Sequence, residues 1–382
     1  MKTFKTDGLD ILSWCIFPED GALAQAKNIA KLPFAHKHIA LMPDTHQGFG
    51  MPIGGVLAAE GTIIPNAVGV DIGCGVIATR TTLKDIERAD LKLILGAIRK
   101  DIPLGFNHRK TPLEIEDVPK GAKIVAQEHK SARKQVGTLG GGNHFIEFQK
   151  GSDGYIWFMV HSGSRNLGKK VCDHYNALAK ETMNSGKGFI VPKAWDLAYL
   201  NTDSKGGQDY IVEMEYCLRF AKLNREIMSN VIAEILEDVT GGKPAESFNV
   251  HHNYARREHH YGKDVWVHRK GATSAKAGEM GIIPGSQGTK SYMVKGKGNP
   301  LSFESCSHGA GRIMGRKQAE KTLNLEREIE KLDAQGILHA IRGVRDLDEA
   351  AGAYKDIDIV MEEQKDLVDI FVELTPLGVI KG

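Results

Sequence analysis

The chain has 382 residues, of which 41% are hydrophobic and 26% charged, and its formal net charge is +2 at pH 7. This length allows one large domain or two modest ones, and the small net charge excludes an overall basic field but leaves room for a local basic face that binds nucleic acid. The apolar runs are too short for a membrane span, the N-terminus is too polar for a signal peptide, and the five cysteines are scattered. We therefore expect a cytoplasmic protein without a disulfide framework and without a membrane segment.

Hydrophobic periodicity predicts helices and strands in irregular order. Helices are expected at about 20–31, 89–100, 121–136, 165–184, 208–238, 316–331 and 357–368. Strands are expected at 65–70, 76–83, 155–163, 265–271 and 371–380, and a loop is expected at 185–207. This order favours an α+β fold over a doubly wound sheet.

Glycine-rich polar stretches recur along the chain, and most of them contain or adjoin a histidine or a cysteine. They read HQGFGMPIGG, VDIGCG, TLGGGNHF, HSGSRNLG, PGSQG and HGAG. The sequence contains no internal repeat and no long linker. A site assembled from such distant segments predicts one intertwined domain over residues 1–382, built from mixed β-sheets with surrounding helices.

The stretch DIGCG places Asp71 and Cys74 in a turn between two predicted strands. Imidazoles come from His144, from His161 at a strand end, and from His252. A tight turn with a small buried thiol, and histidines satisfied at strand ends, would also explain these residues. As a set, however, they suit a borderline ion such as Mn²⁺ or Zn²⁺ better than Ca²⁺ or Mg²⁺. A thiolate can also bridge two ions in a centre for phosphoryl chemistry.

Ten stretches carry a more specific resemblance. They are PDTHQGFGMPIGG (43–55), VDIGCGV (70–76), GGGNHFIE (140–147), HSGSR (161–165), HHNY (251–254), HRKGAT (268–273), PGSQGTKSY (284–292), SHGAGR (307–312), YKDI (354–357) and the terminal Lys381-Gly382. With these motifs in this order, the sequence resembles the RtcB family of RNA-splicing ligases, which join RNA ends using GTP and Mn²⁺. The resemblance spans nearly the whole chain and implies an RtcB-like fold.

The resemblance implies a site with two Mn²⁺ ions. Asp71, Cys74 and His144 look like the ligands of one ion, and Cys74, His161 and His252 like those of the other, with the thiolate shared. It also implies that the catalytic residue is the histidine of SHGAGR, which attacks the α-phosphorus of GTP and carries GMP.

The resemblance further implies a guanylate pocket. Asn143 is expected to donate to the α-phosphate, Glu147 to accept from guanine, and Lys381 to reach a guanine carbonyl. The implied nucleotide-binding residues are Asn143, His144, Phe145, Ile146, Glu147, His252, Asn253, Pro284, Gly285, Ser286, Gln287, Ser291, His308, Gly309, Ala310, Gly311 and Lys381. Gln287 departs from the family pattern, because many relatives have Met there.

Several motif residues keep more than one interpretation. Candidates for pyrophosphate or RNA phosphates, or else for solvated surface charge, are Arg165, Arg269, Lys270 and Arg312. His46 is expected beside the ligands or facing substrate, and Tyr354 near the base.

The implied reaction joins an RNA 2′,3′-cyclic phosphate or 3′-phosphate end to a 5′-hydroxyl end. Water opens the cyclic phosphate, His308 takes GMP from GTP, and GMP passes to the 3′-phosphate. The 5′-hydroxyl then attacks this RNA(3′)pp(5′)G end and releases GMP. Whether the substrate is tRNA halves or damaged RNA stays open, as does a need for the activator protein archease.

Two other functions remain as alternatives. A two-metal phosphoesterase or nuclease would explain the predicted metal ligands but would not need His308, Glu147 or an ordered Lys381. A non-catalytic RNA-binding relative should have lost ligands that are all present here.

Overall fold

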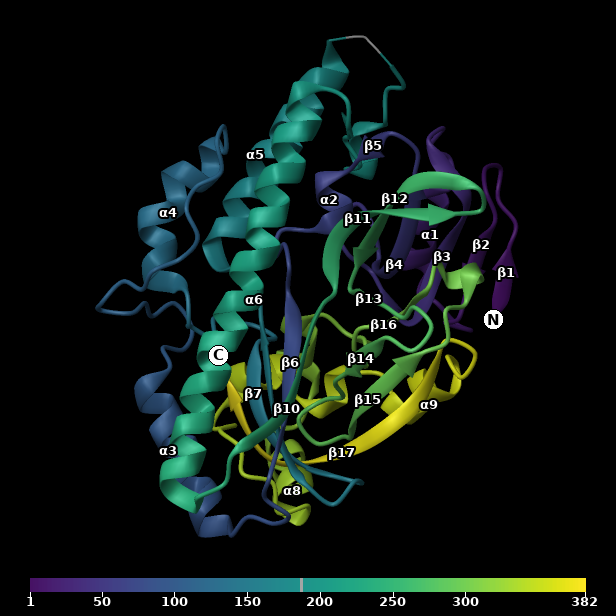
Figure 1. The fold of residues 1–382 in the computed structure, drawn as a ribbon. Coiled ribbons are helices and arrows are strands. Elements are labelled where there is room, and N and C mark those ends of the chain that lie inside the picture. Colours follow the sequence, from purple (N-terminus) through teal and green to yellow (C-terminus); the bar gives the residue numbers. More distant parts are fainter. Residues whose placement is uncertain (186–187) are drawn as a thin grey trace.

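Two β-sheets form the frame of the structure, a computed structural model that describes residues 1–185 and 188–382 (Figure 1). The six-stranded sheet has the order β1 (Lys2–Phe4), β2 (Ile11–Ser13), β3 (Ala35–His46), β4 (Ile53–Ala59), β12 (Lys263–Lys270), β11 (Asn253–His260). The seven-stranded sheet has the order β10 (Pro244–His251), β6 (Gly75–Thr81), β8 (Ile156–Ser162), β7 (Phe145–Gly151), β17 (Val368–Lys381), β15 (Ser291–Gly296), β14 (Met280–Ile283).

Two short strand pairs complete the sheets, β5 (Thr62–Ile63) with β9 (Leu200–Asn201) and β13 (Ala272–Ser274) with β16 (Ser305–Ser307). Strands β2 and β3 pair in parallel, and the other strand pairs named here are antiparallel. Mainly antiparallel sheets combined with helices confirm the α+β prediction.

The seven-stranded sheet is curled, and its edge strands β10 and β14 contact each other. Alternate side chains therefore enter different cores. Val76 and Trp157 pack inside the curl with Leu374, whereas Ile77 and Phe158 pack on the outer face. The outer face is covered by helices.

The helices are α1 (Asp20–Ile29), α2 (Pro65–Val68), α3 (Arg88–Asp101), α4 (Lys123–Gln135), α5 (Arg165–Asn184), α6 (Lys205–Thr240), α7 (Arg316–Thr322), α8 (Leu325–Ala334) and α9 (Ile357–Glu362). Figure 1 shows α6 running along one side of the molecule, with α3, α4 and α5 beside it. Ser204 caps the N-terminus of α6 by accepting from the Gly207 N–H, and Gly241 ends α6 with a left-handed φ of 73°. In the part of the chain described, no helix combines the length and apolarity that crossing a membrane requires.

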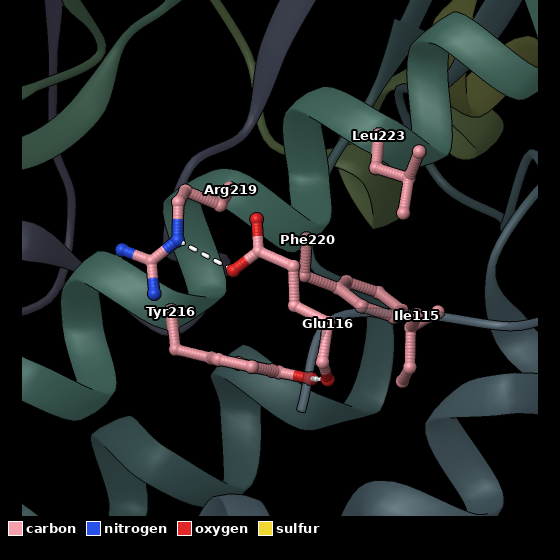
Figure 2. A pocket seen from close by; sticks show the side chains of 6 residues that line it. All are labelled: Ile115, Glu116, Tyr216, Arg219, Phe220 and Leu223. Atoms are coloured by element: carbon pink, nitrogen blue, oxygen red, sulfur yellow. Dashed lines mark hydrogen bonds and ion pairs between the residues drawn. The ribbon is translucent and has the colours of Figure 1, made fainter. Parts of the chain in front are cut away.

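Figure 2 shows how the segment before α4 attaches to α6. Arg219 Nε lies 2.7 Å from Glu116 Oε2, and the Tyr216 hydroxyl donates to the Glu116 carbonyl over 2.6 Å. The small hollow beside these contacts has a volume of about 10 Å³, which is water-sized at most. This feature is an attachment and has no room for a substrate.

Four element predictions were wrong in detail. The strand expected at 65–70 is instead the short helix α2, which begins at Pro65 and ends at Gly69 with a φ of 97°. The helix expected at 316–331 is divided into α7 and α8, because Asn324 caps a new helix by accepting from the Arg327 N–H. The helix expected at 357–368 ends at Glu362.

The loop expected at 185–207 contains β9 and the first residues of α6, and positions 186–187 of it lie outside the described residues.

Candidate active site

Five neighbouring strands of the seven-stranded sheet carry polar side chains at the same end of the sheet. In spatial order, His252 follows β10, Cys74 precedes β6, His161 lies near the end of β8, His144 precedes β7, and Lys381 ends β17. Because these strands pair antiparallel, the end of one lies beside the start of the next. The sheet thus turns five distant segments into one row of polar side chains.

The donor atoms of the predicted metal ligands lie close together. Cys74 Sγ is 3.5 Å from His144 Nε2 and 3.2 Å from His161 Nε2. His161 Nε2 is 3.3 Å from His252 Nε2, and His144 Nε2 is 3.1 Å from Asp71 Oδ2. These atoms form two groups that share Cys74, and within each group they lie within 4.8 Å of one another. The geometry therefore brings all five predicted ligands together in the two sets that the family resemblance implied.

The imidazole orientations fit metal binding. His144 Nδ1 lies 2.9 Å from the Leu139 carbonyl and His161 Nδ1 lies 3.0 Å from the Asn143 carbonyl. With the proton on Nδ1, each ring presents the Nε2 lone pair to the cluster, as metal-ligating histidines do. Burial lowers the pKa of both His161 and His252 well below the usual value, which keeps the rings neutral.

The pKa values of Cys74 and Asp71 are shifted in opposite directions. Burial, aided by the Asp71 carboxylate, raises the pKa of the Cys74 thiol well above its usual value. Burial disfavours ionised Asp71 too, but the hydrogen bond and charge of His144, together with Cys74 and Arg165, outweigh it and lower the pKa of that carboxyl. A divalent cation would reverse the Cys74 shift, because thiols are deprotonated when they bind a metal. This set of donor atoms fits two metal ions of borderline softness that share the Cys74 thiolate.

Helix α6 holds the ligand-bearing segments in place. The buried Arg225 guanidinium donates from Nη1 to the Gly73 carbonyl over 2.9 Å and to the Ser162 carbonyl over 2.8 Å. Its Nε donates to Asn249 Oδ1 over 2.8 Å. The preceding residue, Asn224, accepts from the Gly137 N–H over 2.7 Å. One helix turn thus ties β8, β10 and the DIGCG turn together.

His308 stands beside this cluster, with its ring centroid 4.7 Å from that of His252. Its Nδ1 lies 2.6 Å from Asp44 Oδ2, which also accepts from the His308 N–H over 3.0 Å and from the Gly309 N–H over 3.3 Å. Burial disfavours ionised Asp44, but His308 more than offsets this and lowers the pKa of the carboxyl. A proton on Nδ1 leaves Nε2 as the nucleophilic nitrogen, as in other His–Asp pairs.

His308 lines a cavity of about 1090 Å³, and so do the cluster residues other than His144. Most of the predicted nucleotide-binding residues line it as well: Asn143, Phe145, Glu147, His252, Asn253, Pro284, Gly285, Ser286, Gln287, Ser291, His308, Gly309, Ala310, Gly311 and Lys381. Two of the predicted residues lie elsewhere. His144 sits behind the lining in the metal cluster, and the Ile146 side chain lies in the hydrophobic core on the other face of β7. We therefore assign no nucleotide contact to the Ile146 side chain.

Ionisable side chains, Glu147, Lys381 and Glu349, line one part of the cavity, and both carboxylates are buried. Burial raises the pKa of Glu147 to about 8, against the opposing effects of Gln149 and Lys381. Lys381 Nζ lies 3.8 Å from Glu349 Oε2, and burial lowers its pKa. Strand β17 carries Lys381 here by pairing with Phe145 on β7. The tail is therefore an ordered part of the cavity wall.

The Glu349 carboxylate is the common partner of the basic residues near Lys381. Arg312 Nη1 lies 3.1 Å and Arg316 Nε 2.8 Å from its carboxylate, and the Tyr354 hydroxyl donates to it. Burial disfavours ionised Glu349, but Lys381 and these neighbours together lower its pKa. Arg312 and Tyr354 both line the cavity.

The remaining basic motif residues are placed differently. Arg269 is fully buried, with its Nη1 2.6 Å from Glu258 Oε1, so its phosphate role is corrected to a structural ion pair. Lys270 lines the cavity, whereas Arg165 donates to Thr138 Oγ1 over 3.3 Å. His46 also lines the cavity, and burial lowers its pKa to about 4.

Sequence reasoning missed the residues that support the site. Asp44 lies within the quoted stretch PDTHQG, but its partner His308 is 264 positions away. Arg225 and Glu349 belong to segments without a recognised motif. The signal available for Arg225 was its place on the apolar face of the predicted helix, four residues after Ala221.

Comparison with known proteins gives a consistent result. The family model described as tRNA-splicing ligase RtcB matches residues 25–124 and 113–382. "RNA-splicing ligase RtcB1" of Escherichia coli strain ATCC 25922 is 39% identical over 394 residues, and "RNA-splicing ligase RtcB" of Escherichia coli K12 is 38% identical over 394 residues. Each alignment covers 95% of both chains.

An archaeal protein gives a more distant match. "tRNA-splicing ligase RtcB" of Thermococcus kodakarensis is 32% identical over 443 residues, covering 95% of this chain and 92% of its own. Family match, near-complete coverage and the assembled site agree: the chain belongs to the RtcB family.

Proposed function

We propose that this protein is a GTP-dependent RNA ligase that joins a 2′,3′-cyclic phosphate or 3′-phosphate end to a 5′-hydroxyl end. One observation carries the proposal. A histidine oriented by a buried carboxylate lies against a Cys/His cluster, in a cavity large enough for a nucleotide and an RNA end. The names of the relatives, RNA-splicing and tRNA-splicing ligases, support the same reaction class.

In the first step His308 attacks GTP. Asp44 holds the Nδ1 proton, so the Nε2 lone pair forms the bond to the α-phosphorus. The bond from this phosphorus to the bridging oxygen of the β-phosphate breaks, and pyrophosphate leaves with the electron pair. Asp44 stabilises the positive charge that the ring gains. Two Mn²⁺ ions, held by Asp71, Cys74, His144, His161 and His252, would supply charge neutralisation when bound.

In the later steps GMP moves to the RNA. An oxygen of the RNA 3′-phosphate attacks the His308-bound phosphorus, the P–N bond breaks, and an RNA(3′)pp(5′)G end forms. The 5′-hydroxyl then attacks the 3′-phosphorus and GMP leaves. With the nucleotide and RNA phosphates held in one cavity, charge neutralisation and in-line placement together supply most of the catalysis. Where the RNA ends in a 2′,3′-cyclic phosphate, water first opens this ring to give the 3′-phosphate.

Guanine selection is assigned to Glu147, with Lys381 nearby. Ionised Glu147 accepts from the guanine N1–H and amino group, a donor pair that adenine lacks. Asn143, on the cavity wall, donates to the α-phosphate.

The natural RNA is either a pair of tRNA halves or RNA cleaved by damage, and archease is a candidate activator. We place the protein in the cytoplasm, because its five cysteines are free and buried. We also propose that residues 1–382 act as one catalytic domain, since Asp44 on β3 of the six-stranded sheet pairs with His308, which lies against the cluster at the ends of the seven-stranded sheet.

The test is covalent labelling with Mn²⁺ and GTP labelled at the α-phosphate. We expect an acid-labile, alkali-stable label on the denatured protein, absent from His308→Ala and kept in His259→Ala, whose imidazole is exposed on β11. An absent wild-type label, both with and without archease, would overturn the proposal. Phosphate release without GTP would then favour a two-metal phosphoesterase.

A further inference from the structure

Phe49 is an exposed aromatic residue on the wall of the active-site cavity. Its surface is 83% exposed, although it lines the same cavity as His308. Val70, which is 52% exposed and directly precedes Asp71, lines the cavity too. Large apolar side chains left in solvent at a binding cavity commonly mark a contact with a ligand.

The loop that carries Phe49 is firmly held even though the ring is left to solvent. Lys270 Nζ donates to the Phe49 carbonyl over 2.5 Å and to the Asn66 carbonyl over 2.8 Å. The Gln25 amide donates to the Gly48 carbonyl over 2.6 Å and accepts from its N–H over 3.0 Å. Binding to the ring would therefore require little ordering of the backbone.

This loop lies at the His252 end of the ligand row. Gly271, the neighbour of Lys270, donates its N–H to Asn253 Oδ1 over 2.8 Å, and a Cβ added there would lie 3.0 Å from His308 Cε1. Glu147 and Lys381 belong to β7 and β17, at the other end of the row. A nucleotide bound at Glu147 thus leaves the Phe49 end free.

The polar groups at the Phe49 end do not suit a chain of phosphates. The Lys270 ammonium is already donated to two carbonyls. Asp173 and Asp196 also line the cavity, and their carboxylates hold two lysines, Lys169 over 2.5 Å and Lys180 over 2.6 Å. The Asn66 amide donates to the Asp196 carbonyl over 3.1 Å, which places these groups together. An aromatic ring beside acceptors suits a neutral, flat nucleobase with hydrogen-bond donors.

We propose that Phe49 is an RNA-binding residue that stacks on the terminal base of one of the two RNA ends being joined. The inference rests on the proposed function, since it requires an RNA end at His308. The base belongs to either the 3′-phosphate end or the 5′-hydroxyl end, and both ends present the same flat surface to the ring.

The test is a double-mutant cycle on RNA binding, with Mn²⁺ and without GTP. Fluorescence anisotropy gives the Kd of a short RNA with a normal terminal nucleotide and of the same RNA with an abasic terminal ribose. One arm places the abasic ribose at a 3′-phosphate end and the other at a 5′-hydroxyl end. In one arm, we expect base removal to weaken wild-type binding about 5- to 100-fold, the range for one lost base–aromatic stack.

The variants decide the outcome. In Phe49→Ala the base removal should cost less than about twofold, whereas Phe49→Trp should keep the wild-type difference. Phe17→Ala is the matched control, because that ring is 87% exposed but lies outside the cavity lining. Equal base effects in wild type and Phe49→Ala, or no base effect at either end, would overturn the assignment. GMP labelling of the wild type, which needs no RNA, reports separately on the proposed function.

Discussion

Asp44 decides which nitrogen of His308 faces the cavity, and it also carries charge. Its Oδ2 accepts from three N–H groups at the start of the HGAG turn. Asparagine can keep an acceptor in this place but cannot stabilise the charge that the imidazole gains when the P–N bond forms. The two functions of Asp44 can therefore be separated by a conservative change.

We expect Asp44→Asn to slow His308 guanylylation about 10- to 100-fold, the loss of one charge-assisted hydrogen bond. The check is single-turnover labelling at saturating GTP, with the GTP Kd measured alongside. A Kd within about threefold of the wild type would show that the nucleotide pocket survived. An unchanged labelling rate would remove the Asp44 charge from the mechanism.

Glu147 makes GTP binding depend on pH. Burial raises its pKa in the folded protein to about 8, above the ordinary 4.5, so the folded protein holds a proton that the unfolded chain releases. Its favourable contribution to folding is complete below pH 4.5 and is lost as pH rises through about 8. Guanine needs the ionised form, so GTP binding should strengthen as pH rises from 6 to 8.

We expect Glu147→Gln to weaken GTP binding and to remove this part of its pH dependence, while making the protein about 1–3 kcal/mol more stable at pH 8. Isothermal titration with GTP and chemical unfolding, each at pH 6 and pH 8, check both effects. Parallel pH profiles for the two proteins would contradict a titrating Glu147.

At the level of elements, the sequence does not reveal that α6 positions the segments around the candidate metal site. Its hydrophobic face predicts packing, and the prediction of a long helix is confirmed. Arg225, however, is fully buried on that helix and binds the carbonyls of Gly73 and Ser162. These partners lie 152 and 63 positions away, so no local pattern reveals them.

We expect Arg225→Lys to lower the free energy of unfolding by about 2–4 kcal/mol and to weaken Mn²⁺ binding, because lysine cannot replace the guanidinium fork. Arg219→Lys is the matched control on the same helix; its exposed pair with Glu116 should contribute less than about 1 kcal/mol. Urea unfolding and Mn²⁺ titration measure the two effects. Equal losses in both variants would contradict the positioning role of Arg225.

The predicted element boundaries were wrong where a single residue changed the local backbone conformation. Pro65 and Gly69 confine an apolar stretch to one helical turn, although its composition resembles a strand. Asn324 begins a second helix inside a region that is helical in pattern throughout. The hydrophobic period was informative only in the second case, and in both cases the residues at the helix ends set the boundaries.

At the scale of the whole molecule, the motifs predicted which side chains gather at the candidate site, while the sheet explains how they meet. Order β10-β6-β8-β7-β17 places His252, Cys74, His161, His144 and Lys381 in a row. This order is not the chain order, and strand pairing over long sequence separations depends on contacts that no single segment encodes. The α+β class was predictable, but the order of strands was not.

Metal binding should stabilise the whole fold, because His252 lies between β10 of one sheet and β11 of the other. A ligand at 100 times its Kd adds about 2.7 kcal/mol, so saturating Mn²⁺ should raise the Tm by several degrees and EDTA should reverse it. We expect Cys74→Ala to lose most of this shift, since both donor groups share Cys74. Cys217→Ala removes another buried thiol, outside both groups, and should lower the Tm while keeping the Mn²⁺ shift. A full Mn²⁺ shift in Cys74→Ala, measured by scanning calorimetry, would mean that the thiolate does not bridge the two sites.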